Sequence, residues 1–158
     1  MNILLAIDGS PYSKAALTAV LERPWPAGSH FKAITVVEPF HPEYAGWQTN
    51  YVPLAVEAQK EQLDSARKLI EDSAKALSAK FGDQFVSGDV IEGYIKDRIL
   101  DQAKHWPADL IVCGSHGRRG FTKFLLGSVS EALVAHAPCS IEIVKIPHPT
   151  QEQGHEHL

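Results

Sequence analysis

One stretch of this sequence combines glycines, serines and basic residues in a way that suits anion binding. It reads GSHGRRGFTKFLLGS, from Gly114 to Ser128, and contains no acidic residue. Its basic residues are Arg118, Arg119 and Lys123, in a chain whose formal net charge is -4. Glycines allow a phosphate to approach the backbone closely, and cationic side chains attract its charge. We therefore expect this stretch to bind a phosphate group.

The flanking segments place this loop between a strand and a helix. Residues 110–113 form a short apolar run typical of a strand buried on both faces, and a helix is expected from Ser128 to Ala135. The first N–H groups of such a helix have no partner within it and lie at the positive end of its dipole. Here they belong to Gly127, Ser128, Val129 and Ser130. An alternative explanation of Ser128 needs no ligand, because Ser128 and Glu131 match the S-x-x-E capping box.

Two common nucleotide-binding motifs do not fit the loop. The Walker A pattern needs a lysine after its last glycine, whereas Gly127 is followed by Ser128. The dinucleotide fingerprint G-x-G-x-x-G follows the first strand, whereas Gly114, Gly117 and Gly120 follow the fourth expected strand and are separated by pairs of residues. Neither motif therefore accounts for these glycines.

Apolar and amphipathic segments alternate regularly along the chain. Strands are expected at residues 2–7, 31–37, 85–90, 110–113 and 139–146. Helices are expected at residues 11–22, 53–81, 93–106 and 128–135, with Ser10 capping the first and Gly82 ending the second. This alternation predicts an α/β fold, a single-domain open five-stranded parallel sheet with helices on both faces. Such sheets bind ligands at the carboxyl ends of their strands, which here are Asp8, residues 37–38 and Gly114.

Length and composition limit the classes of protein to which the chain can belong. Its 158 residues suit one domain, and 44% apolar with 22% charged residues is ordinary for a globular protein. We expect this domain at residues 1–146 and a polar tail at 147–158. The net charge of -4 argues against a nucleic-acid partner, and no apolar run is long enough for a signal peptide or a membrane span.

The two cysteines, Cys113 and Cys139, both lie in apolar segments. In neighbouring parallel strands they would be offset by about four residues, or roughly 13 Å, whereas a disulfide requires Cα atoms within about 7 Å. We therefore expect both thiols to stay reduced, which fits a cytoplasmic location.

Three features of the sequence resemble the universal stress protein family, in its ATP-binding subclass. They are ILLAIDGS at 3–10, the pattern Gly114, two residues, Gly117, nine residues, Gly127-Ser128, and HAPC at 136–139. The expected order of strands and helices agrees with that family over residues 1–146. The resemblance implies a Rossmann-like, adenine-nucleotide α-hydrolase-like sheet that binds ATP, with Mg²⁺ arriving on the nucleotide.

The resemblance also implies which residues touch the nucleotide. It implies nucleoside contacts at Ala6, Ile7 and Asp8, an adenine contact at Val36, ribose and α-phosphate contacts at Gly114, Ser115 and Gly117, a nearby guanidinium at Arg118, and outer-phosphate contacts at Gly127, Ser128, Val129 and Ser130. Asp8 also has a simpler explanation, as an acidic turn residue before a helix. The connection at 39–52 is not diagnostic of the family, and its role stays open.

The function expected from this resemblance is that of a nucleotide-responsive regulatory protein in the stress response. An alternative is a slow ATPase or phosphotransferase, but Asp8 is the only obvious carboxylate near the expected site, and phosphoryl transfer needs a metal held by carboxylates. An adenylyl-transfer enzyme of the related α/β type would carry a pyrophosphate loop after the first strand, which DGSP at 8–11 lacks. His116 has no nucleophile and orienting carboxylate arranged around it, so we assign no catalytic residue. We also assign no metal ligand, because the tail histidines suit a solvated segment.

The last expected strand, at 139–146, suits a homodimer interface. In the strand order that the resemblance implies, this strand lies at the sheet edge and nothing after it can cover it. An edge strand presents unpaired N–H and C=O groups that invite another strand. A twofold dimer would pair this strand with its own copy. The alternative is that Glu142 and Lys145 are edge charges that prevent such pairing.

Overall fold

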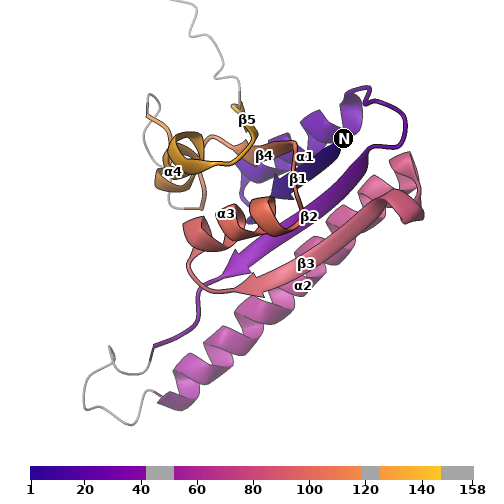
Figure 1. Ribbon diagram of the computed structural model, residues 1–158. Coiled ribbons are helices and arrows are strands. Elements are labelled where there is room, and N and C mark those ends of the chain that lie inside the picture. The colour runs from indigo at the N-terminus through magenta and orange to yellow at the C-terminus, as the bar shows by residue number, and fades with distance from the viewer. Residues whose placement is uncertain (42–51, 119–124, 147–158) are drawn as a thin grey trace, which may run out of the picture.

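Five parallel strands form one open sheet in the order β3-β2-β1-β4-β5 (Figure 1). The computed structural model describes residues 1–41, 52–118 and 125–146. Its strands are β1 (Asn2–Ala6), β2 (His30–Val37), β3 (Val86–Glu92), β4 (Leu110–Gly114) and β5 (Ser140–Val144). Its helices are α1 (Pro11–Glu22), α2 (Val52–Phe81), α3 (Ile95–His105) and α4 (Ser128–His136), with a 3-10 turn, η3, at Asp83–Phe85. The predicted fold class is therefore confirmed.

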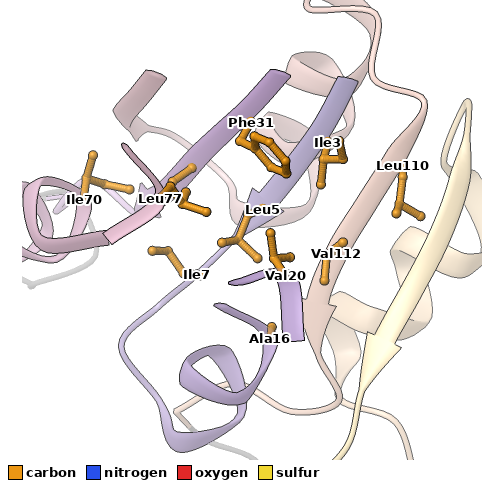
Figure 2. Close-up of a cluster of buried hydrophobic side chains, with 11 residues drawn as sticks. Ile3, Leu5, Ile7, Ala16, Val20, Phe31, Ile70, Leu77, Leu110 and Val112 are labelled. Carbon is orange, nitrogen blue, oxygen red and sulfur yellow. The ribbon is translucent and has the colours of Figure 1, made fainter. Parts of the chain in front are cut away.

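Helices pack on both faces of the sheet. On one face, Leu5 of β1 belongs to a buried cluster with Val20 of α1 and Leu77 of α2 (Figure 2). On the other face, Leu4 belongs to a second cluster with Leu133 of α4, which residues of α3 also join. Because successive side chains of a strand point to opposite faces, a continuous apolar strand is buried on both of its sides.

The direction in which the sheet grows reverses at β1. This strand pairs with β2 on one side and β4 on the other, and Ala6 lies opposite both Ile34 and Cys113. The chain leaves β1 toward α1 on one face and leaves β4 toward α4 on the other. Ligands of open parallel sheets bind at such a reversal point, outside the carboxyl ends of the strands.

Several sequence-based assignments need correction, and one of them is the fifth strand, which spans Ser140–Val144 rather than the expected 139–146. Gly127, and not Ser128, is the N-cap of α4, with no side-chain cap hydrogen bond, so the capping-box alternative for Ser128 is wrong. The third strand begins at Val86, because Phe85 belongs to η3, and it extends to Glu92. The third helix begins at Ile95 rather than at Gly93, whose φ of 143° is outside the helical range.

Two further expectations can be compared with the described residues. Cys113 lies opposite Ile143 in the β4–β5 register, and both cysteines are free thiols, as predicted. Within the described ranges, no helix is both long and apolar enough to cross a membrane. The expected tail at 147–158 and most of the connection at 39–52 lie outside the described residues.

Candidate functional site

Two adjoining cavities open at the carboxyl ends of the strands. The larger has a volume of about 600 Å³ and lies between the end of β2, the middle of α2 and the first turns of α3 and α4. The smaller, of about 90 Å³, lies closer to the sheet and has mostly apolar walls. Both are lined by Asp8, Val36, Ile95 and Val129, so they form one continuous candidate site.

The turn after β1 fixes the position of Asp8 at this site. One carboxylate oxygen, Oδ1, accepts a hydrogen bond of 2.9 Å from the N–H of Ser10. The other, Oδ2, accepts one of 3.1 Å from the N–H of Arg118. Ser10 in turn caps α1, because its Oγ accepts from the N–H of Ser13 at 3.2 Å, as the sequence predicted. The Asp8 side chain therefore joins the turn after β1 to the loop after β4. This role goes beyond that of a simple turn residue.

Close packing explains two glycines of the β4 loop. A Cβ built on Gly114 would lie 2.7 Å from the backbone of Tyr12, so β4 and α1 could not approach as they do. A Cβ on Gly127 would lie 3.2 Å from the Cα of His116. The N–H of Gly127 donates to the carbonyl of Ser115 at 2.8 Å, which closes the loop. These glycines therefore place the N-terminus of α4 beside the end of β4.

The N-terminus of α4 has the properties of an anion site. Its N-cap, Gly127, has no side chain with which to satisfy the first N–H groups. The first hydrogen bond of the helix runs from the N–H of Glu131 to the Gly127 carbonyl at 2.9 Å. The N–H groups of Ser128, Val129 and Ser130 therefore have no acceptor within the helix and lie at the positive end of its dipole.

Charge at the larger cavity is mixed. The Arg118 guanidinium lines it, and its Nε donates to the Asp8 carbonyl at 2.5 Å. Glu38 and Asp97 line it as well, so the expectation that Asp8 is the only carboxylate nearby was wrong. Two of the three basic residues predicted for the loop, Arg119 and Lys123, lie outside the described residues.

Most residues predicted for the site line one cavity or both. These residues are Ala6, Ile7, Asp8, Val36, Gly114, Gly117, Arg118, Ser128, Val129 and Ser130. Ser115 and Gly127 do not line them, and the hydrogen bond between their backbones instead shapes the loop. The hydroxyl of Ser130 donates to the carbonyl of Gly114 at 2.8 Å, so this side chain ties α4 to β4.

Sequence reasoning missed a second group of lining residues. They are Thr35, Gln62, Tyr94, Lys96 and Asp97, from the end of β2, from α2 and from the start of α3. Helices that follow parallel strands begin at the same edge of the sheet, so the start of α3 could have been expected there. The place of Gln62 could not, because it depends on where α2 crosses the sheet edge.

Two side chains near the smaller cavity could take part in chemistry, but their surroundings do not support it. The Nδ1 atom of His116 lies 3.0 Å from Ser115 Oγ, and its ring lies against Tyr12 with centroids 5.0 Å apart. Burial raises the pKa of the Cys113 thiol to about 11, which keeps it protonated and unreactive near neutral pH. In the part of the chain that the structure describes, no group of three or more His, Cys, Asp or Glu residues could hold a metal ion.

Comparison with known proteins gives a consistent result. Residues 1–145 match the model of the universal stress protein family. A universal stress protein of Thermus aquaticus is 31% identical over 144 residues, which are 91% of this chain and 98% of that relative. A universal stress protein A homolog of Coxiella burnetii is 38% identical over 95 residues, 60% of this chain and 62% of that relative. The chain spans about half, 51%, of a related Mycobacterium tuberculosis protein, to which it is 32% identical over 159 residues covering 96% of this chain.

Solved structures show the same fold at low sequence identity. A universal stress protein of Lactobacillus plantarum superimposes with a TM-score of 0.75 at 24% identity, covering 91% of this chain and 97% of that one. An Arabidopsis thaliana family protein with AMP bound has a TM-score of 0.61 at 16% identity, covering 96% of this chain and 97% of that one. A universal stress protein in complex with cAMP has a TM-score of 0.64 at 18% identity, covering 91% of this chain and 96% of that one.

Proposed function

Because the chain belongs to the universal stress protein family, we propose that it binds ATP at the site between β1, β4 and α4. In this proposal the protein is regulatory, and nucleotide occupancy changes which partners it binds during the stress response. Its free cysteines fit a reducing cytoplasm.

One observation supports the proposal more strongly than the others. The N-terminus of α4 has no side-chain cap, and Ser128 at its first position lines the 600 Å³ cavity together with Arg118. Backbone N–H groups without an acceptor in their own helix, a helix dipole and a guanidinium on one cavity wall are suited to phosphate oxygens. The phosphates would lie at α4, with Gly117 and Arg118 alongside them.

The fold relatives support an adenine nucleotide as the ligand. Two solved structures of the same fold are named for bound AMP and bound cAMP, and the loop of this chain carries the Gly114–Ser128 pattern that resembles the ATP-binding signature. Val36 lines both cavities, so it offers the purine an apolar contact where the two cavities meet.

Mg²⁺ would accompany the nucleotide and neutralise part of the phosphate charge. Magnesium is usually held by phosphate oxygens, waters and one or two carboxylates, so a complete protein cage is not required. Asp8, Glu38 and Asp97 line the cavity and could supply such carboxylates.

The test is calorimetric titration of ATP, ADP, AMP and cAMP into the wild-type protein and two Ser128 variants. Ser128→Glu places a negative charge where the phosphates are proposed, yet an acidic residue in the first turn stabilises a helix by about 0.3–1 kcal/mol. We expect this variant to lose ATP affinity at least tenfold without a lower thermal midpoint. Ser128→Gln has the same size without the charge and should keep most of the affinity. Equal ATP affinity in all three proteins contradicts phosphate binding at α4.

A further inference from the structure

Tyr94 is a large aromatic side chain at the rim of the larger cavity. It is the N-cap of α3 but makes no side-chain cap hydrogen bond, so the start of the helix does not need it. The residue is 62% exposed, so the hydrophobic core does not need it either. It nevertheless lines the 600 Å³ cavity. The position of Tyr94 is therefore best explained by what enters the cavity.

The cavity has two chemically different ends. Ser128 and Arg118 stand at the end that follows β4, where phosphate oxygens can be held. Tyr94, Val37 and Glu38 stand at the end formed by β2 and the start of α3. Because β1 separates β2 from β4 in the sheet, these ends are about two strand spacings, or roughly 10 Å, apart. A nucleotide that lies along the larger cavity with its phosphates at α4 would therefore extend its base toward Tyr94.

The ring of Tyr94 also has an aromatic neighbour on one side. It stacks on the ring of His41, which follows β2, with centroids 6.4 Å apart and planes inclined by 18°. A flat ring supported from one side loses little conformational entropy when a second flat group binds to it. This arrangement suits a nucleobase, because every base has a π-face that can stack on an aromatic side chain.

We infer that Tyr94 stacks on the base of the bound nucleotide and makes the site prefer a nucleotide to free polyphosphate. This inference rests on the proposed function, and it names a specificity residue for that same site. The strength of stacking increases with ring overlap and does not depend on hydrogen bonds to the edges of the base. Tyr94 should therefore favour purines over pyrimidines and discriminate little between adenine and guanine.

The experiment compares how wild-type protein, Tyr94→Ala and Tyr94→Phe bind ATP and inorganic triphosphate, which lacks the nucleoside. ATP and inorganic triphosphate are titrated by calorimetry, and the triphosphate of 2-aminopurine riboside, whose fluorescence falls when the base stacks, reports on the base directly. We expect Tyr94→Ala to lose ATP affinity about tenfold, to keep its affinity for triphosphate and to lose the fluorescence quenching. Tyr94→Phe should behave as wild type, because it keeps the ring.

Each outcome separates this inference from the function on which it rests. If Tyr94→Ala binds ATP as tightly as wild type and quenches equally, stacking on Tyr94 is excluded and ATP binding stands. If Tyr94→Ala weakens ATP and triphosphate equally, the ring does not act on the base, and the inference is overturned. If the wild-type protein binds neither ligand, the proposed function fails, and this inference fails with it. Circular dichroism melts verify that the variants are folded.

Discussion

The Asp8 carboxylate accepts a hydrogen bond of 3.1 Å from the backbone N–H of Arg118, 110 positions away in the sequence. The Arg118 side chain returns the contact, because its Nε donates to the Asp8 carbonyl at 2.5 Å. The turn after β1 and the loop after β4 are thus joined at the point where the sheet reverses. Because Asp8 also lines both cavities, the order of the site depends on this contact.

We first predict that Asp8→Ala weakens ATP binding at least tenfold and also lowers stability. The variant loses the two hydrogen bonds that the carboxylate accepts from Ser10 and Arg118. At about 1 kcal/mol for each bond, the free energy of unfolding should fall by roughly 1–2 kcal/mol. Urea unfolding and ATP titration measure the two effects separately.

Two further variants serve as controls for this prediction. Asp8→Asn keeps one carbonyl oxygen as an acceptor, so its stability should lie between those of Asp8→Ala and wild type. Asp64→Ala removes an exposed ion pair with Arg67 on α2, which should change stability by less than about 1 kcal/mol and leave ATP affinity unchanged. Full ATP affinity in Asp8→Ala would show that the tie between the loops does not order the site.

Local sequence signals predicted the parts of the fold that depend on short segments. The apolar run at 2–7 and the Ser10 cap both predicted their elements, because burial on two faces and helix capping act within a few residues. The start of α4 at Ser128 was also predicted, but the N-cap is Gly127, so the capping-box explanation of Ser128 is wrong. The hydrogen bond of Gly127 to Ser115 instead brings the glycine to the N-cap, and that loop closure is not encoded in the motif.

Sequence motifs predicted the half of the site that is formed by the loop between β4 and α4. Gly117, Arg118 and Ser128 belong to one continuous segment, and all three line a cavity as expected. The other half comes from Tyr94 and Gln62, on helices whose placement depends on how α2 and α3 pack on the sheet. Hydrophobic periodicity indicates which face of a helix is buried, but it does not show which of its turns lies beside a ligand.

We next predict that the two thiols differ in reactivity toward a disulfide reagent at pH 8. Burial raises the pKa of Cys113 to about 11, so only about one thiol in a thousand is the reactive thiolate at this pH. The pKa of Cys139 is also raised by burial, but this residue is only half-buried and more accessible. Cys139 should therefore react first, and Cys113 should react at full rate only after unfolding in urea.

Mass spectrometry of the labelled protein identifies which cysteine has reacted. Cys139→Ser should remove the faster phase and leave the slow one, whereas Cys113→Ala should leave the faster phase unchanged. Because the pKa of Cys113 is raised, its rate should keep rising with pH from 8 toward 11. Rapid labelling of Cys113 in the native protein at pH 8 contradicts the buried position of this thiol.

The last prediction concerns the open edge of β5, where we propose that two copies of the chain pair. In the β4–β5 ladder the carbonyl of Val144 accepts from the N–H of Ser115 at 2.9 Å, so the backbone of Val144 faces β4. Backbone groups alternate along a strand, so the N–H and C=O of Ile143 face away from the sheet, where a second β5 can reach them. The Glu142 carboxylate forms a bidentate ion pair with Arg23 of the same chain. This pairing argues against the alternative that Glu142 is an edge charge that repels a second strand.

Ile143→Pro therefore removes a donor from the proposed interface without removing a hydrogen bond to β4. We expect the wild-type protein to sediment as a dimer at tens of micromolar and this variant as a monomer. Ile143 is half-buried, so its replacement by Pro also loses some side-chain packing. Lys145→Pro avoids this loss, because it changes the next outward-facing backbone position, where the side chain is exposed. Val144→Pro is the contrasting variant, because it breaks a bond inside the sheet and should lower the thermal midpoint most. A wild-type protein that sediments as a monomer at this concentration, or folded Ile143→Pro and Lys145→Pro variants that remain dimeric, excludes pairing through β5.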